Sequence, residues 1–312
     1  MGRALAPRGN GGTPLVVGAS SAARRHSARF AKPSYSNLPP SLTSTVTIVP
    51  GLEPVAALHR RELPQKDNLC GAFWGTLALR GAGVTEVDGE PVDQDLVALH
   101  AGTTLPEGDP ETFVPHGAVP RNDYRLELPL AADPEASGTS APALARSIER
   151  LSGGKLAVVP VAGHWSGESV LDLVEIVAET APEALALANI DTGPLWGSHP
   201  DPALVVAHLS GADVDPPPSD WSVGHFFNLL GTIRGPGGSF VFVRDSYASL
   251  GWGGHHLQPP DVLAAALERG DGPEGGILCV CPSAEHTALR GRLAGSYELR
   301  HWGNGTPDPE GR

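Results

Sequence analysis

A cysteine and a glutamine five residues before it are the first residue types whose spacing points to chemistry. Gln65 precedes Cys70, and the cysteine opens a Gly/Ala/aromatic run that is typical of the first turn of a helix. The free N–H groups and the positive end of the helix dipole favour a thiolate at this position. A glutamine amide can donate a hydrogen bond to the oxyanion formed when a thiolate attacks a carbonyl. The pair therefore predicts a nucleophile with an oxyanion donor.

A base and an orienting carboxylate are expected from two strands much later in the chain. His225 stands at the start of an apolar strand expected over 223–233, and Asp245 follows a second expected strand over 239–243. The Gly/Pro-rich residues 234–238 predict a hairpin, which brings the open ends of the two strands together. We expect Asp245 to accept the Nδ1–H of His225, so that Nε2 of the imidazole faces the thiol.

This order of residues resembles the papain-like cysteine peptidase superfamily, and most of all its bacteriocin-leader (double-glycine) peptidase branch. The resemblance rests on a Gln ahead of a Cys that opens a helix, on Gly-His-Phe at a strand start, and on an Asp after the next strand. It implies a papain-like α+β fold, in which the nucleophile helix packs against a C-terminal antiparallel sheet. The roles that it implies are an oxyanion donor, a nucleophile, a general base and an orienter, in the order Gln65, Cys70, His225 and Asp245. We expect no cofactor and no metal at these residues.

The rest of the sequence predicts the class and the domain limits. Helices dominate the first part and antiparallel strands the later part, which predicts class α+β. We expect a disordered or loosely attached extension over 1–44, one hydrolase domain over 45–303 with an insertion at about 103–220, and a flexible tail over 304–312. The expected helices cover 70–80 with Asp67 or Asn68 as N-cap, 93–101, 140–151, 168–179, a short one from 201, 259–267 and 285–293. The other expected strands cover 45–49, 155–161, 184–190, 276–280 and 297–301.

Composition excludes several function classes. The chain has 312 residues and a net charge of −13, and the first 52 residues hold six of its 22 basic and none of its 35 acidic side chains. The remainder is therefore strongly acidic and repels nucleic acids. Three cysteines make no disulfide framework, and no apolar run approaches the ~20 residues that cross a bilayer. We expect a cytoplasmic bacterial protein, because a reducing compartment suits free thiols and the Ala/Gly/Pro/Arg bias is typical of GC-rich bacteria.

Weaker motifs favour structural explanations. Cys279 and Cys281 fall on one face of an expected strand near His255 and His256 in sequence, but closed zinc sites normally show CxxC-type spacing. The segment 163–169 fails the G-x-S-x-G pattern at both serines and is better explained as a loop with an N-cap.

Three function classes remain. The first is a thiol-dependent hydrolase that acts on a peptide or small amide through an acyl-enzyme. The second is an acyltransferase or peptide cyclase that uses the same residues, with an amine or thiol in place of water. The third is a non-catalytic binding module of papain-like shape, which is disfavoured because all four catalytic roles are filled.

Overall fold

The computed structural model describes residues 44–49, 51, 53–108, 113–269 and 272–311. The expected extension over 1–44 lies outside these residues except for Ser44. Among the described residues, no helix is both long and apolar enough to cross a membrane.

A seven-stranded sheet forms the centre of the fold. Its strands are β1 (Thr45–Ile48), β6 (Leu156–Val161), β7 (Leu185–Asp191), β8 (Gly224–Arg234), β9 (Ser239–Arg244), β10 (His255–Gln258) and β11 (Gly276–Pro282). Six of them lie in the order β10–β9–β8–β7–β11–β6, and β1 pairs with β8 beyond the end of β7. Every neighbouring pair is antiparallel. Together with the helices, this sheet confirms class α+β.

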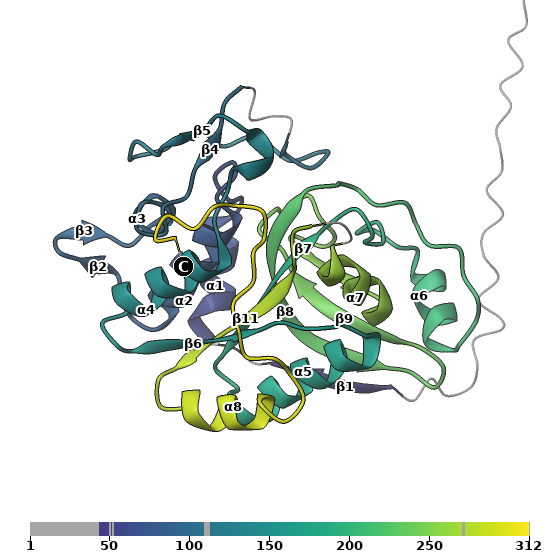
Figure 1. Cartoon of the computed structure of the whole chain (residues 1–312). Helices are drawn as coiled ribbons and strands as arrows, with labels where there is room; N and C mark the ends of the chain where they lie inside the picture. Colours follow the sequence, from purple (N-terminus) through teal and green to yellow (C-terminus); the bar gives the residue numbers. More distant parts are fainter. Residues whose placement is uncertain (1–43, 50, 52, 109–112, 270–271, 312) are drawn as a thin grey trace, which may run out of the picture. The chain divides into compact units, whose positions relative to one another are not determined.

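Helices cover both faces of this sheet (Figure 1). They are α1 (Glu53–Glu62), α2 (Cys70–Gly81), α3 (Gln94–His100), α4 (Ala141–Leu151), α5 (Gly167–Thr180), α6 (Pro202–Leu209), α7 (Pro260–Glu268) and α8 (His286–Leu293). Helices α1 to α4 form one layer, whereas α5, α7 and α8 pack on the opposite face. The two-residue strands β2 (Glu86–Val87), β3 (Glu90–Pro91), β4 (Leu105–Pro106) and β5 (Leu130–Ala131) and the 3₁₀ helix η3 (Pro134–Ala136) lie outside this core.

The central strands are apolar on both faces because both faces are covered. In β7, Leu185 and Leu187 join the core under α2 and α4, while Ala186 and Ala188 join the core under α5 and α7. Side chains alternate between the faces of a strand, so a strand between two helical layers needs apolar residues at successive positions.

Where β1 pairs with β8, Gly231 is required, since a Cβ there would lie 2.3 Å from the carbonyl oxygen of Thr47.

The segment expected to be an insertion, 103–220, supplies part of this core. It contributes α4, β6, α5 and β7, and β7 lies in the middle of the sheet between β8 and β11. We therefore correct the expectation of an insertion into a smaller papain-like domain: most of the segment is integral to the sheet and both helical layers. Only the residues between α3 and α4 form a long excursion with little regular structure.

Two elements of the structure were not expected from the sequence, helix α1 and strand β10. The expected strand over 297–301 is reduced to a single bridge between Ala162 and Glu298.

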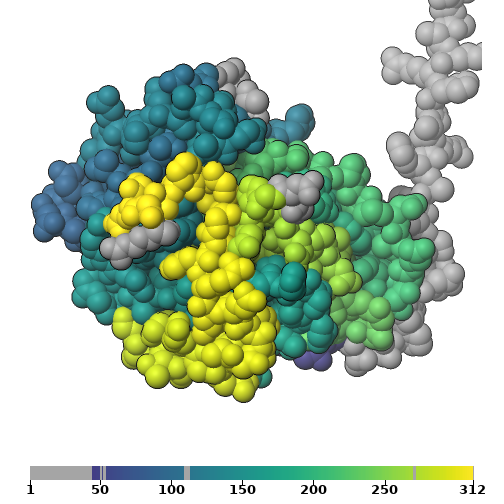
Figure 2. Space-filling view, viewed as in Figure 1, coloured from purple at the N-terminus to yellow at the C-terminus, as the bar shows by residue number. Residues whose placement is uncertain are grey.

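The C-terminal segment after α8 returns to the helical layer that contains α2 (Figures 1 and 2). Figure 2 shows this segment in yellow, crossing the visible face between the blue-to-teal and the green residues. Asn304 donates to the carbonyl of Thr139, and Asp308 forms an ion pair with Arg146 of α4. Residues 304–308, which we expected in a flexible tail, are therefore held by specific contacts.

Candidate active site

Cys70 is the first residue of α2, and one contact of this helix with the sheet fixes where the thiol lies. Trp74 donates from Nε1 to the carbonyl oxygen of Phe226 on β8 over 3.0 Å. An α-helix rises one turn in 3.6 residues, so Cys70 lies about one turn before this anchor. His225 immediately precedes Phe226 in the strand. The same contact thus sets α2 against the strand that carries the imidazole of His225.

Helix α2 begins without a side-chain cap, which differs from the expected start. Leu69 occupies the N-cap position. Asn68 has a left-handed backbone with φ of 61°, which is not the extended conformation of a capping residue. The Oδ1 atom of Asp67 accepts the backbone N–H of Arg121 over 3.0 Å instead. The first N–H groups of the helix therefore receive no capping side chain, and such groups favour an anion.

His225 and Asp245 meet at one end of the hairpin formed by β8 and β9. Arg244 pairs with Asn228, so Asp245 follows directly at the end of β9, close to the start of β8. The Nε2 atom of His225 lies 3.0 Å from Oδ1 of Asp245, and both side chains are almost fully buried. Since a carboxylate only accepts, Nε2–H donates this hydrogen bond. The hairpin predicted from the sequence therefore brings the two residues together.

The imidazole is turned the other way from our expectation. Because Nε2 is directed at Asp245, Nδ1 is the nitrogen left for the thiol, and Cys70 contributes to the raised pKa of His225. The expected arrangement, with Nδ1 on the carboxylate, is therefore corrected. The rotation of a ring about χ2 is set by its neighbours, which a sequence pattern does not contain.

Asp245 receives further donors that hold it as a carboxylate. The backbone N–H groups of Ser246 and Tyr247 donate to its Oδ1 over 2.7 and 3.3 Å. His256 on β10 lies 3.5 Å from its Oδ2, and Gln258 donates to the other ring nitrogen of His256 over 3.1 Å. Nδ1 of His256 is thus the acceptor, so Nε2 carries the proton that points at Asp245.

Burial and charge act against each other on this pair. Burial alone would lower the pKa of His225, but the charge of Asp245, their hydrogen bond and the interaction with Cys70 outweigh it and raise that pKa above its ordinary value. Burial would raise the pKa of Asp245, but the charges and hydrogen bonds of His225 and His256 lower it below its ordinary value. The pair is therefore an imidazolium beside a carboxylate at neutral pH.

Gln65 is oriented by the residue that follows Asp245. Ser246 Oγ donates to Oε1 of Gln65, and the backbone N–H of Gln65 donates to the carbonyl oxygen of Ser246 over 2.9 Å. Because Oε1 is held as an acceptor, the amide nitrogen Nε2 is the end of the side chain that remains to donate. Gln65 lines the same cavity as Cys70 and His225. This placement suits the oxyanion donor expected from the sequence.

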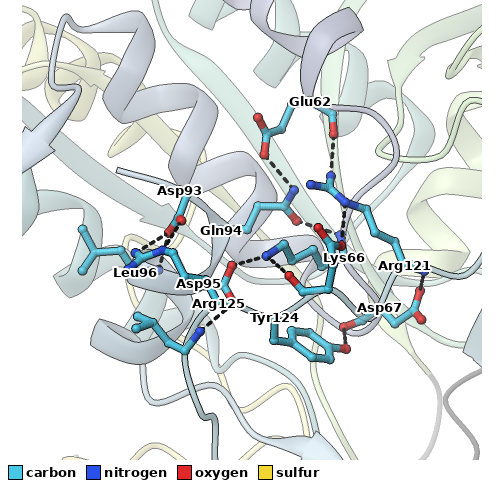
Figure 3. Close-up of polar contacts among 12 residues, drawn as sticks. Glu62, Lys66, Asp67, Asp93, Gln94, Asp95, Leu96, Arg121, Tyr124 and Arg125 are labelled. Atoms are coloured by element: carbon cyan, nitrogen blue, oxygen red, sulfur yellow. Dashed lines mark hydrogen bonds and ion pairs between the residues drawn. The ribbon is translucent and has the colours of Figure 1, made fainter. Parts of the chain in front are cut away.

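A buried ion pair fixes the loop that carries Gln65 (Figure 3). Lys66 forms an ion pair with Asp95, and their side chains are only 8% and 0% exposed. The backbone N–H of Lys66 donates to Oε1 of Gln94 over 2.8 Å, and Nε2 of Gln94 donates to Glu62 over 2.9 Å. The start of α3 therefore holds the loop that leads into α2.

The excursion between α3 and α4 holds this loop from the other side (Figure 3). Arg121 donates from Nη1 to the carbonyl oxygens of Glu62 and Pro64 over 3.1 and 2.9 Å. The hydroxyl of Tyr124 donates to the carbonyl oxygen of Asp67 over 2.8 Å. Residues on both sides of Gln65 are thus fixed by hydrogen bonds, which hold the loop that carries its side chain in one position.

A cavity of about 160 Å³ joins these residues. Its walls come from the loop before α2, from η3 and its surroundings, from the start of β8 and from the C-terminal segment. The ring of Trp221, which also lines it, lies edge-on to His225 at 4.8 Å and to Tyr247 at 5.5 Å. The indole therefore shields the imidazole from water on this side, which strengthens its interaction with Asp245. Trp252 is 55% exposed and lies outside this lining.

The weaker candidates from the sequence do not enter this site. Cys279 and Cys281 are buried in the sheet core, and burial raises the pKa of both thiols above their ordinary values. His255 contacts Arg244 and the ring of His59 rather than the two cysteines. Within the described ranges, no group of three or more His, Cys, Asp or Glu side chains is arranged to hold a metal ion.

Sequence reasoning missed the partners of the four expected residues. His256 and Ser246 contact Asp245 or Gln65 directly, and Arg269 lines the cavity. The sequence does contain a signal for both residues, since Ser246 directly follows Asp245 and His256 is one of two adjacent histidines. Their roles depend on which strands pair, and that is not a local property of the sequence.

Comparison with known proteins places the chain in a family. Residues 49–302 match the model of a family of unknown function (DUF6885), and the chain belongs to this family. None of the curated proteins matches the chain. The matched range contains Gln65, Cys70, His225 and Asp245.

Proposed function

We propose that this DUF6885 family member is a thiol-dependent amide hydrolase of papain-like type, with Cys70 as nucleophile. The observation that carries the proposal is one cavity lined by Cys70, His225 and Gln65, with Asp245 hydrogen bonded to the far side of the imidazole. This arrangement supports the roles of nucleophile, base, orienter and oxyanion donor that acyl transfer through a thiol requires. The expected substrate is a peptide or small amide.

The proposed reaction has two halves. In the first, Sγ of Cys70 bonds to the acyl carbon, the C–N bond breaks, and the amine leaves with a proton from Nδ1 of His225. The amide nitrogen of Gln65 and the first N–H groups of α2 stabilise the oxyanion of the tetrahedral intermediate. In the second half, water attacks the thioester, His225 takes its proton, and the C–S bond breaks to release the acid.

Acylation by an activated ester tests the proposal without knowledge of the natural substrate. Incubated with p-nitrophenyl acetate, the protein should release p-nitrophenol in a burst and carry an acetyl group on Cys70, located by peptide mass spectrometry. Cys70→Ala should abolish the burst, and His225→Ala should slow it about 100-fold or more, the usual contribution of a general base. Cys279→Ser is the matched control and should leave the burst intact. Acetylation of a residue other than Cys70, or a burst rate that is the same in His225→Ala as in the wild type, would overturn the proposal.

The fate of the acetyl group separates the hydrolase from an acyltransferase that uses the same residues. The acetyl-enzyme should decay in water alone at a rate that depends on His225. If it decays only when a primary amine is added, acyl transfer replaces hydrolysis. A thioester that forms without His225 and does not decay in either condition would favour a binding module.

A further inference from the structure

Arg269 directs a positive charge into the cavity beside the proposed catalytic pair. It is the C-cap residue of α7 and lines the cavity together with Cys70 and His225. Nη1 of its guanidinium donates to the carbonyl oxygen of Asn304 over 3.1 Å. A Cβ at Gly224 would lie 2.9 Å from Nη2, so the guanidinium lies against the residue that precedes His225.

No acidic side chain of the described residues forms an ion pair with Arg269. Arg146, which is also partly exposed, instead holds Asp308 in a bidentate pair. Burial lowers the pKa of Arg269, and the charges of Asp191 and Cys70 oppose that change. Asp191 acts only at longer range, so the guanidinium keeps donors for a ligand.

Two amides at the cavity have buried atoms without partners. Asn304 is only 8% exposed, and its Nδ2 donates to the carbonyl oxygen of Thr139. Its Oδ1 is buried and has no hydrogen-bond partner. Nδ2 of Asn68, next to the nucleophile helix, is also buried and unpaired. Such groups cost free energy unless a ligand or water satisfies them. The lining of the cavity therefore combines the cation of Arg269 with two amide side chains, each of which has a buried polar atom without a partner.

We infer that Arg269 is a specificity residue that binds a carboxylate of the substrate next to the carbonyl attacked by Cys70. The inference rests on the proposed function and narrows its substrates to amides and peptides that carry a free carboxylate close to the scissile bond. A guanidinium is the side chain best suited to a carboxylate, which it binds through two parallel N–H donors. Glu135, the acidic residue of the lining, is solvent exposed, so water screens its charge more than that of Arg269.

A matched pair of alkylating reagents tests this inference. Iodoacetate and iodoacetamide both form an S–C bond with Cys70 and release iodide, but only iodoacetate carries a carboxylate. The second-order rate constants of both reagents are measured on the full chain at pH 6.5 and low salt, and their ratio reports preference for the anion. Arg269→Gln should lower the ratio about tenfold, as expected for loss of a charge-assisted hydrogen bond. Arg269→Lys should retain part of it.

Arg292→Gln is the control for net charge. Arg292 lies on the surface of α8 and its ion pair with Glu179 is exposed, so this variant should leave the ratio unchanged. The imidazolium of His225 also attracts iodoacetate, but it is present in all three variants and cancels in the comparison.

The outcomes separate the inference from the function on which it rests. If Cys70 reacts rapidly with iodoacetamide and requires His225, but Arg269→Gln leaves the ratio unchanged, the carboxylate site is refuted and the hydrolase stands. If Cys70 reacts no faster than a free thiol with either reagent, and its rate constants do not change in His225→Ala, the proposed function itself fails. A ratio that falls equally in Arg292→Gln would show a long-range charge effect and would also refute the site.

Discussion

The three cysteines differ in environment, and this difference gives a prediction at the scale of residues. Cys70 is partly exposed in the cavity, whereas Cys279 and Cys281 are inside the sheet, where burial raises the pKa of Cys281 to about 12. The thiolate is the reactive form, so the buried pair should be inert in the folded protein. We expect iodoacetamide to modify Cys70 alone at pH 6.5 and all three thiols in urea. Peptide mapping checks this, and modification of Cys279 in the folded protein would contradict it.

The buried pair of His225 and Asp245 should make stability depend on pH in a defined direction. The pKa of His225 is raised from 6.5 to about 10, so its stabilisation is complete below pH 6.5 and is lost as pH rises toward 10. The pKa of Asp245 is lowered from 3.8, so its stabilisation is present above that pH and is lost as pH falls below it. The contribution of the pair is therefore largest between about pH 4 and 6.5.

Asp245→Asn tests this dependence. The variant should be less stable than the wild type by about 3 kcal/mol near pH 6, because removal of one partner leaves a buried charge without compensation. The difference should shrink progressively at pH 8 and pH 9. Urea denaturation at several pH values measures it. A difference that stays constant from pH 5 to 9 would contradict the raised pKa of His225.

Residue types and order carried the prediction of the central site residues. A local signal, either a helix start or a strand end, was enough to predict the place of each residue in its element. In the structure the four residues line or adjoin one cavity: Gln65, Cys70, His225 and Asp245. The orientation of the imidazole and the contact with His256 follow from packing across β8, β9 and β10. No local pattern encodes that packing, which explains why the expected tautomer needed correction.

At the scale of elements, the loop before α2 depends on a buried ion pair. Lys66→Met should leave the carboxylate of Asp95 buried without its cation and cost about 3–5 kcal/mol. It should also speed amide hydrogen exchange in the loop around Gln65 and slow acylation of Cys70. Glu90→Gln is the control, since the Glu90–Arg125 pair is exposed and contributes about 1 kcal/mol or less. Equal effects of both substitutions would show that the buried pair does not position the loop.

The elements themselves were predicted well where local rules apply. Helices α4 and α5 were expected over 140–151 and 168–179, and Ser140 and Ser166 cap them because their side chains accept backbone N–H groups of the first turn. Strand β10 was missed because it is four residues long and follows a Gly-rich loop. The place of β7 in the centre of the sheet could not be predicted, since it depends on pairing with β8 and β11 from distant parts of the chain.

At the scale of the whole molecule, the C-terminal segment supports the strand that carries His225. The ring of Trp302 packs against Gly276 of β11, where a Cβ would lie 2.6 Å from it. Trp302 donates to Oδ1 of Asn189 over 3.3 Å, and Nδ2 of Asn189 donates to the carbonyl oxygen of His225 over 3.3 Å. The C-terminal segment is thus linked through the sheet to the start of β8.

Gly276→Ala tests this link, because an added methyl group must displace the Trp302 ring. Overpacking of this kind costs about 1–3 kcal/mol, and the loss of the contact between Trp302 and Asn189 should also slow acylation of Cys70. Gly291→Ala is the matched control: a Cβ at this position of α8 meets nothing within 4 Å, so the variant should be neutral or more stable by about 0.5–1 kcal/mol. Urea denaturation and the p-nitrophenol burst measure both effects. If Gly276→Ala loses stability but acylates at the wild-type rate, the C-terminal segment stabilises the fold without positioning His225.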